Sequence, residues 1–219
     1  MIDYPGQWKD ETCFIIGGGP SAKDTCQKYH DPIINSGVKI IVINDAFLLF
    51  PEADVLYFGD KEWWPDNKDE VKRIFKGQIF TKSARGGDST IHLKSPEKVK
   101  RNDGFIVPGW SENPLIVGGH DSGHQAINLA HHFGVSAIFL VGFDMKQKDG
   151  QNNWHNRHER FRSDKVVAPE KYDLTFVPGY TNVAKECARN GIRVFNMNPD
   201  SVLEVFPKLK MEDLFDVRD

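Results

Sequence analysis

The chain has 219 residues, of which 39% are hydrophobic and 27% are charged. This composition excludes a disordered or fibrous protein, and the length suffices for one sizeable domain with a real core. The net charge of −3 gives no overall basic field of the kind that attracts nucleic acid or an acidic membrane.

The three cysteines, Cys13, Cys26 and Cys187, are odd in number and widely spaced. They predict no disulfide framework and fit a reducing compartment. The first residues lack the basic stretch and apolar core of a signal peptide, and no apolar run is long enough to span a bilayer. We therefore expect a cytoplasmic protein without a membrane span.

Apolar runs alternate with helical patterns along the chain. Strands are predicted at 13–16, 38–43, 54–58, 78–82, 89–94, 137–141 and 193–196, and helices at about 20–29, 62–76, 122–133 and 181–190. Residues 95–103 are expected to form a polar loop, and the polar, histidine-rich stretch 146–178 a lid-like insertion. Near-continuous apolar strands that alternate with helices predict an α/β domain with a mainly parallel sheet.

A glycine-rich turn follows the first predicted strand and consists of Gly17, Gly18, Gly19, Pro20 and Ser21. Glycines let a ligand approach the main chain, and proline suits the first turn of a helix. Free N–H groups at a helix N-terminus attract phosphate, so we expect a phosphate-bearing ligand here. The alternative is a tight turn that holds nothing.

Small polar residues also follow other predicted strands. Asn44 and Asp45 follow the second, Asp60 follows the third after a glycine, and Asp144 follows the strand at 137–141. Ligands of parallel α/β sheets bind outside the carboxyl ends of the strands. These residues are therefore candidate ligand contacts, although each one alone could simply cap the next helix.

The stretches 15–21, 122–144 and 194–201, together with the strand that ends at Asn44, resemble the bacterial family 42 sialyltransferases. They are equally similar to a related family of bacterial and phage proteins, some of them close to archaeal 6-hydroxymethylpterin pyrophosphokinases. The sialyltransferase resemblance implies one Rossmann-like domain over residues 1–219, with a lid, that binds a cytidine nucleotide sugar without a metal. It also implies phosphate contacts at 17–21 and nucleotide contacts at Asn44, Ser122 and Gly123.

Three positions depart from the sialyltransferase pattern. Asp60 and Gly18 each replace an asparagine near the donor, and residues 177–181 lack the histidine that ends the lid of that family. A histidine base would then be His155 or His158, and this departure argues against sialic acid as the transferred sugar.

The predicted lid carries groups that suit sugar transfer. His155 and His158 could take a proton from an acceptor hydroxyl, since histidine titrates near neutrality, and Arg157 could meet phosphate oxygens. The same stretch, with Trp154 and further arginines, also fits a surface that contacts nucleic acid, or a plain solvated loop. His120 and His124 are four residues apart, but no third ligand completes a zinc set, and no metal site is predicted.

The sequence therefore predicts a nucleotide-sugar-dependent glycosyltransferase that acts on a glycan or a hydroxylated nucleobase. The catalytic candidates are His155, His158 and Asp60. The candidate donor-binding residues are Gly17, Gly18, Gly19, Pro20, Ser21, Asn44, Asp45, Ser122, Gly123, Asp144 and Arg157. One alternative is a pyrophosphokinase in which Asp60 and Asp144 hold Mg²⁺; another is a non-catalytic phage or bacterial assembly protein.

Overall fold

The computed structural model describes residues 4–101, 104–106, 109–155 and 176–215. Its central feature is a seven-stranded sheet with the order β5-β4-β3-β2-β1-β8-β9. The strands are β1 (Thr12–Ile16), β2 (Lys39–Ile43), β3 (Val55–Phe58), β4 (Gln78–Thr81), β5 (Ile91–His92), β8 (Ala137–Val141) and β9 (Arg193–Asn196). Every neighbouring pair is parallel, which confirms the predicted Rossmann-like α/β fold.

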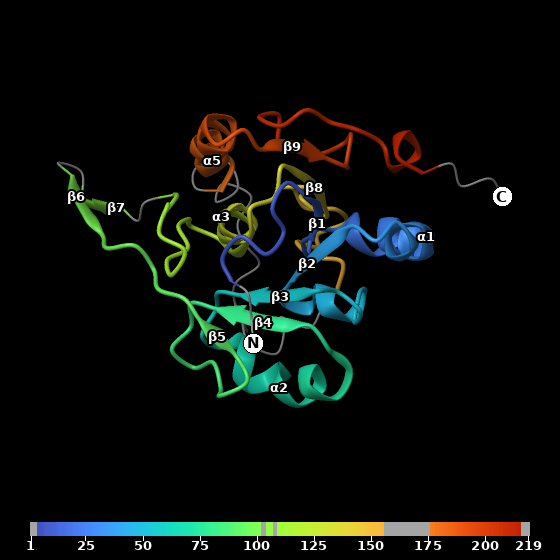
Figure 1. Ribbon diagram of the computed structural model, residues 1–219. Coiled ribbons are helices and arrows are strands. Elements are labelled where there is room, and N and C mark those ends of the chain that lie inside the picture. Colours follow the sequence, from blue (N-terminus) through green and yellow to red (C-terminus); the bar gives the residue numbers. More distant parts are fainter. Residues whose placement is uncertain (1–3, 102–103, 107–108, 156–175, 216–219) are drawn as a thin grey trace.

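Helices cover both faces of the sheet (Figure 1). They are α1 (Ala22–Asn35), α2 (Trp63–Ile74), α3 (Ser122–Phe133) and α5 (Val177–Arg189), with short 3-10 helices η1 (Asn44–Leu48) and η4 (Met211–Asp213). Alternate residues of β1 supply both layers: Cys13 and Ile15 pack with α3 and α5, while Phe14 and Ile16 pack with α1 and α2. This burial on both faces explains why the strands read as continuous apolar runs.

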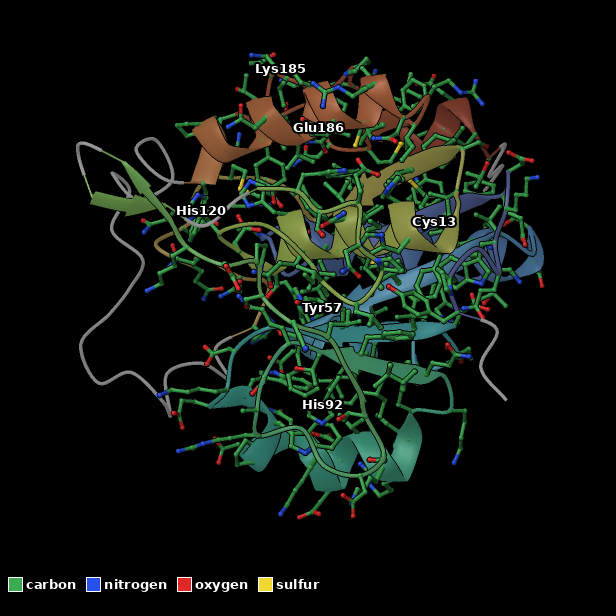
Figure 2. All side chains as sticks on the ribbon, turned by 60° about the vertical axis from the view of Figure 1, so that its left-hand side comes forward. Cys13, Tyr57, His92, His120, Lys185 and Glu186 are labelled. Carbon is green, nitrogen blue, oxygen red and sulfur yellow. The ribbon has the colours of Figure 1, made fainter. Side chains whose placement is uncertain are left out.

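The interior and the outer surface are clearly separated by residue type. Tyr57 of β3 lies inside the molecule, on the face that α3 covers, whereas Lys185 lies on the outer side of α5 (Figure 2). All three cysteines are free and buried, and burial raises the pKa of Cys26 and of Cys187 to about 12. None of the described helices is both long and apolar enough to cross a membrane.

Three predicted boundaries are corrected by the structure. α1 continues past Tyr29 to Asn35 and includes Pro32, because the neighbouring Ile33 is fully buried and its packing outweighs one lost helix hydrogen bond. Pro20 does not lie in the first turn of α1, since it precedes the N-cap residue Ser21. α5 begins at Val177 rather than at residue 181, with a proline in its first turn.

The stretch predicted as a polar loop, 95–103, contributes one strand of a small second sheet. β6 (Val99–Arg101) and β7 (Gly104–Ile106) pair in antiparallel fashion and project away from the main body (Figure 1). The predicted lid-like insertion, 146–178, falls mostly on residues 156–175, which lie outside the described part of the chain.

The order in which strands are added to the sheet switches sides at β1. The chain passes from β1 to β2 on one side, and β8 later pairs with the other side of β1. The carboxyl ends of β1 and β8 therefore face the same edge of the sheet, at the position where α/β proteins of this type usually bind ligands. We call this edge the carboxyl edge.

Candidate functional site

The glycine turn after β1 is joined directly to the end of β8. The N–H of Gly17 donates to the carbonyl of Val141 at 2.7 Å, and the N–H of Gly19 donates to the carbonyl of Gly142 at 2.9 Å. A methyl group on Gly19 would lie 2.5 Å from the Gly142 oxygen and would also strike the Asp144 carboxylate. The space that the missing side chain of Gly19 leaves is therefore filled by the loop after β8, not by a ligand.

Asp144 holds the N-terminus of α1. Its Oδ1 accepts from the Ser21 N–H at 3.2 Å and from Asn198 Nδ2 at 2.9 Å, while its Oδ2 accepts from the Ser21 hydroxyl at 2.9 Å. Burial raises the pKa of Asp144, and the hydrogen bonds from Ser21 oppose that shift. A carboxylate therefore takes the position at which the sequence predicts a phosphate.

The start of the predicted lid lies against the glycine turn. The Trp154 N–H donates to the Gly18 carbonyl at 3.1 Å, and a methyl group on Gly18 would approach Asn153 Oδ1 to 3.1 Å. The indole Nε1 of Trp154 is buried and has no hydrogen-bond partner, although a buried indole N–H normally finds one. This N–H is one of several polar groups near the carboxyl edge that the described residues leave unsatisfied.

Asn44 is another such group, and its backbone is strained. It follows β2 with a φ of 50°, in the left-handed region that asparagine tolerates better than most residues. Its side-chain Oδ1 is buried, and no residue of the described chain donates a hydrogen bond to it. A buried oxygen without a donor, on a left-handed backbone at the end of a central strand, makes Asn44 a candidate ligand contact.

Asp45, next in the chain, is built into the protein interior. It is 2% exposed, and its Oδ2 accepts from the indole N–H of Trp63 at 3.1 Å. His155 Nε2 lies 3.6 Å from the same oxygen, and the His155 side chain is 7% exposed. Asp45 is therefore the buried carboxylate neighbour of the candidate base His155.

Asp60 lies at the exposed end of β3. Its Oδ1 accepts from the Glu62 N–H at 3.0 Å, and its carbonyl accepts from the Trp63 N–H at 3.3 Å, just before α2. Trp63 and Trp64 are each 3% exposed and pack into the core rather than facing a ligand.

Lys82 is a site residue that the sequence reasoning missed. It follows β4 at the carboxyl edge, and burial lowers its pKa, while the charges of Asp121 and Asp60 oppose this shift. Within the described chain it makes neither an ion pair nor a hydrogen bond. The signal available in the sequence was a charged residue that ends the predicted strand at 78–82.

Gly59 lies between Lys82 and α3. A methyl group there would lie 2.5 Å from Gln125 Oε1, 3.3 Å from Lys82 Cε and 3.3 Å from Ser122 Oγ. Ser122 is thus near the ends of β3 and β4. By contrast, Gly123 serves packing, because a methyl group there would strike the Tyr180 hydroxyl and lie 2.8 Å from the Phe143 ring.

A second cluster, formed by Asp121, His124 and Tyr180, surrounds the start of α3; the sequence reasoning considered His124 only as a zinc ligand. Asp121 caps this helix by accepting from the His124 N–H at 2.9 Å, and its Oδ2 lies 2.9 Å from His124 Nδ1. The Tyr180 hydroxyl donates to Asp121 Oδ1 at 3.2 Å, and the Tyr180 ring stacks on His124 with centroids 3.9 Å apart. Burial acts to raise the pKa of Asp121, but its contacts with His124 and Tyr180 outweigh this and lower the pKa.

The structure thus brings Ser21, Asn44, Asp60, Ser122 and Asp144 to one edge of the sheet, with His155 beside Asp45. His158 and Arg157 lie outside the described residues. Across the described ranges, no group of three or more histidine, cysteine or acidic side chains is arranged to hold a metal ion.

Comparison with known proteins adds no assignment. No protein-family model matches the chain, and a search of curated proteins found no relative.

Proposed function

We propose that this protein is a glycosyltransferase that takes a sugar from a nucleotide sugar and passes it to a hydroxyl acceptor. The observation that carries the proposal is the unsatisfied side-chain oxygen of Asn44. Its Oδ1 is buried without a donor, on a backbone with a φ of 50°, at the carboxyl end of a central strand. A nucleobase or ribose of the donor supplies the N–H or O–H that this oxygen lacks.

The proposed reaction needs a base for the acceptor, and His155 fills that role. His155 Nε2 faces the buried Asp45 carboxylate at 3.6 Å, which favours the imidazolium that forms when the ring takes a proton. In the proposed step the acceptor hydroxyl loses its proton to His155 and its oxygen bonds to the anomeric carbon. The bond from that carbon to the phosphate oxygen breaks, and the nucleotide leaves with the electron pair.

Asp60 contributes to the donor side of the site in this proposal. It lies beyond β3, between the loop that holds Asn44 and the loop that holds Lys82, and its carboxylate reaches the exposed edge. Sugar hydroxyls are good donors to such a carboxylate, so Asp60 is suited to binding the transferred sugar. The acceptor is a glycan or a hydroxylated base in DNA.

The main alternative, a magnesium-dependent pyrophosphokinase, would use Asp60 and Asp144 as metal ligands. The Asp144 carboxylate already accepts from Ser21 and Asn198 and is largely buried, at 4% exposed. A magnesium ion there would have to replace these hydrogen bonds. This arrangement favours sugar transfer over metal-dependent phosphoryl transfer.

A binding and turnover experiment tests the proposal. Purified protein is melted with a panel of nucleotide sugars, with nucleoside triphosphates and with the matching nucleosides, each with and without Mg²⁺. Protection by a nucleotide sugar without Mg²⁺, followed by slow release of free nucleotide, is the expected result. Protection by ATP only with Mg²⁺ would replace this proposal with the pyrophosphokinase.

A further inference from the structure

Lys82 is a cation that the described residues leave without a partner at the carboxyl edge. Burial lowers its pKa, and the two carboxylates that oppose this shift are each engaged elsewhere. Asp121 is held by His124 and Tyr180, and Asp60 accepts from the Glu62 N–H. A partly buried ammonium without an ion pair is costly, and an anionic ligand is the simplest compensation for that cost.

The surroundings of Lys82 are held by hydrogen bonds and include a second possible donor to a phosphate, the Ser122 hydroxyl. Gln125 is fixed by the Tyr57 hydroxyl, which donates to its Oε1 at 2.8 Å, and by its own Nε2, which donates to the Gly119 carbonyl at 2.9 Å. Burial raises the pKa of Tyr57 well above its ordinary value, so this phenol stays a neutral donor. Lys82 and the Ser122 hydroxyl both border Gly59 at the end of β3, since a methyl group there would lie 3.3 Å from Lys82 Cε and 3.3 Å from Ser122 Oγ.

The usual phosphate position of this fold is already occupied by the protein itself. At the N-terminus of α1 the Ser21 N–H and hydroxyl both donate to the Asp144 carboxylate. A phosphate placed beside that carboxylate would meet a like charge in a buried setting. The carboxylates of Asp121 and Asp60 also lie near Lys82, but there the ammonium opposes their charge. The end of β4 therefore offers the phosphates of a bound nucleotide a positive charge along the same edge.

We infer that Lys82, assisted by the Ser122 hydroxyl, binds the phosphate of the nucleotide donor at the ends of β3 and β4. This inference rests on the proposed function for the identity of the donor. It places the phosphate on the other side of Asn44 from the glycine turn. Both assignments keep the base or ribose at Asn44 and differ only in where the negative charge lies.

Charge-removing substitutions at two lysines test the inference. Lys82→Gln removes the proposed phosphate ligand, and Lys185→Gln removes the same charge from the exposed outer side of α5 (Figure 2). Affinity is measured by calorimetric titration with the nucleotide sugar that protects the wild type, with its nucleoside, and with inorganic pyrophosphate. Lys82→Gln should weaken nucleotide-sugar and pyrophosphate binding by about 10- to 100-fold and leave nucleoside binding unchanged, whereas Lys185→Gln should change none of them.

Two further measurements guard against a folding artefact. The melting temperature of unliganded Lys82→Gln should equal or exceed that of the wild type, because the variant no longer buries part of a charge. Lys82→Arg should retain most of the phosphate affinity, since it keeps the positive charge.

The possible outcomes separate this inference from the proposed function. If the wild type binds a nucleotide sugar and Lys82→Gln binds it equally well, the inference is overturned and the proposed function stands. If the wild type binds pyrophosphate through Lys82 but no nucleotide sugar, the inference stands as an anion site and the proposed function fails. If the wild type binds neither, both fail.

Discussion

The carboxylate of Asp144 receives both the main-chain N–H and the hydroxyl of Ser21, at 3.2 Å and 2.9 Å. These two residues are 123 positions apart in the sequence and join the ends of β8 and β1 at the centre of the sheet. A side chain thus supplies the negative charge that the N-terminus of α1 attracts. The glycine turn therefore differs from a phosphate-binding loop, because the Asp144 carboxylate already accepts the hydrogen bonds that a phosphate would receive there.

The Asp144→Asn variant should change how stability depends on pH. Because burial raises the pKa of Asp144, the folded protein holds this proton more tightly than the unfolded chain does. The contribution of Asp144 to the free energy of unfolding should therefore fall as the pH rises from its ordinary pKa of 3.8 through the raised value. Urea unfolding of wild type and variant, measured at steps of about one pH unit between pH 3 and pH 7, gives the free energy of unfolding of each protein as a function of pH. If the two proteins show the same dependence on pH, the prediction is contradicted.

Asp121 should show the opposite trend. Its pKa is lowered in the folded protein, so its contribution to stability is present above its ordinary pKa of 3.8 and is lost as the pH falls through the lowered value. Asp121→Asn should remove this loss and should cost about 1–3 kcal/mol at neutral pH, because His124 loses its carboxylate partner. The same urea series on Asp121→Asn provides the check, and an unchanged stability at pH 7 would count against the described contacts.

Gly19→Ala should destabilise the protein by about 2 kcal/mol or more. The added methyl group would lie 2.5 Å from the Gly142 carbonyl oxygen, which belongs to the main chain and cannot turn aside. Gly109→Ala is the matched control, since a methyl group there meets nothing within 4 Å and its φ is not among the positive values. Chemical denaturation of both variants decides the point, and equal stabilities would show that the glycine turn is looser than described.

Asn44 allows strain and ligand contact to be separated. Asn44→Gly and Asn44→Ala both remove the amide, but only alanine is strained at a φ of 50°, at a cost of about 1–2 kcal/mol. Alanine should therefore lower the melting temperature, and glycine should leave it close to that of the wild type. Both should bind the nucleotide at least about 10-fold more weakly if the amide contacts it. A glycine variant with wild-type affinity would remove Asn44 from the site.

Much of the fold was predictable because its strands are buried on both faces. The run of β-branched residues in β2 and the alternation of α3 with β8 follow directly from the hydrophobic pattern. The end of α1 was not predictable in this way. Pro32 indicates a helix stop locally, and only the burial of Ile33 against the sheet, a tertiary contact, keeps the helix going.

The candidate site was predictable only where its residues follow strands. Asn44 and Asp60 were found because parallel strands end at one edge. Lys82 and Tyr180 were missed, and His124 was considered only as a zinc ligand, since their contacts come from neighbours that are distant in sequence. The position of Asp144 was predicted at the same edge, but its contact with Ser21 depends on the exact approach of two loops, which no local pattern records.

The central claim is that the carboxyl edge around Asn44 binds a nucleotide. Its most direct test is the melting temperature of wild type and Asn44→Gly across a panel of nucleotide sugars. At a ligand concentration about 100 times Kd, binding should add about 2.7 kcal/mol to the stability of the wild type, and a 10-fold weaker Asn44→Gly should lose at least about half of that gain. If no nucleotide sugar raises the melting temperature of the wild type, the account of this edge as a donor site is contradicted.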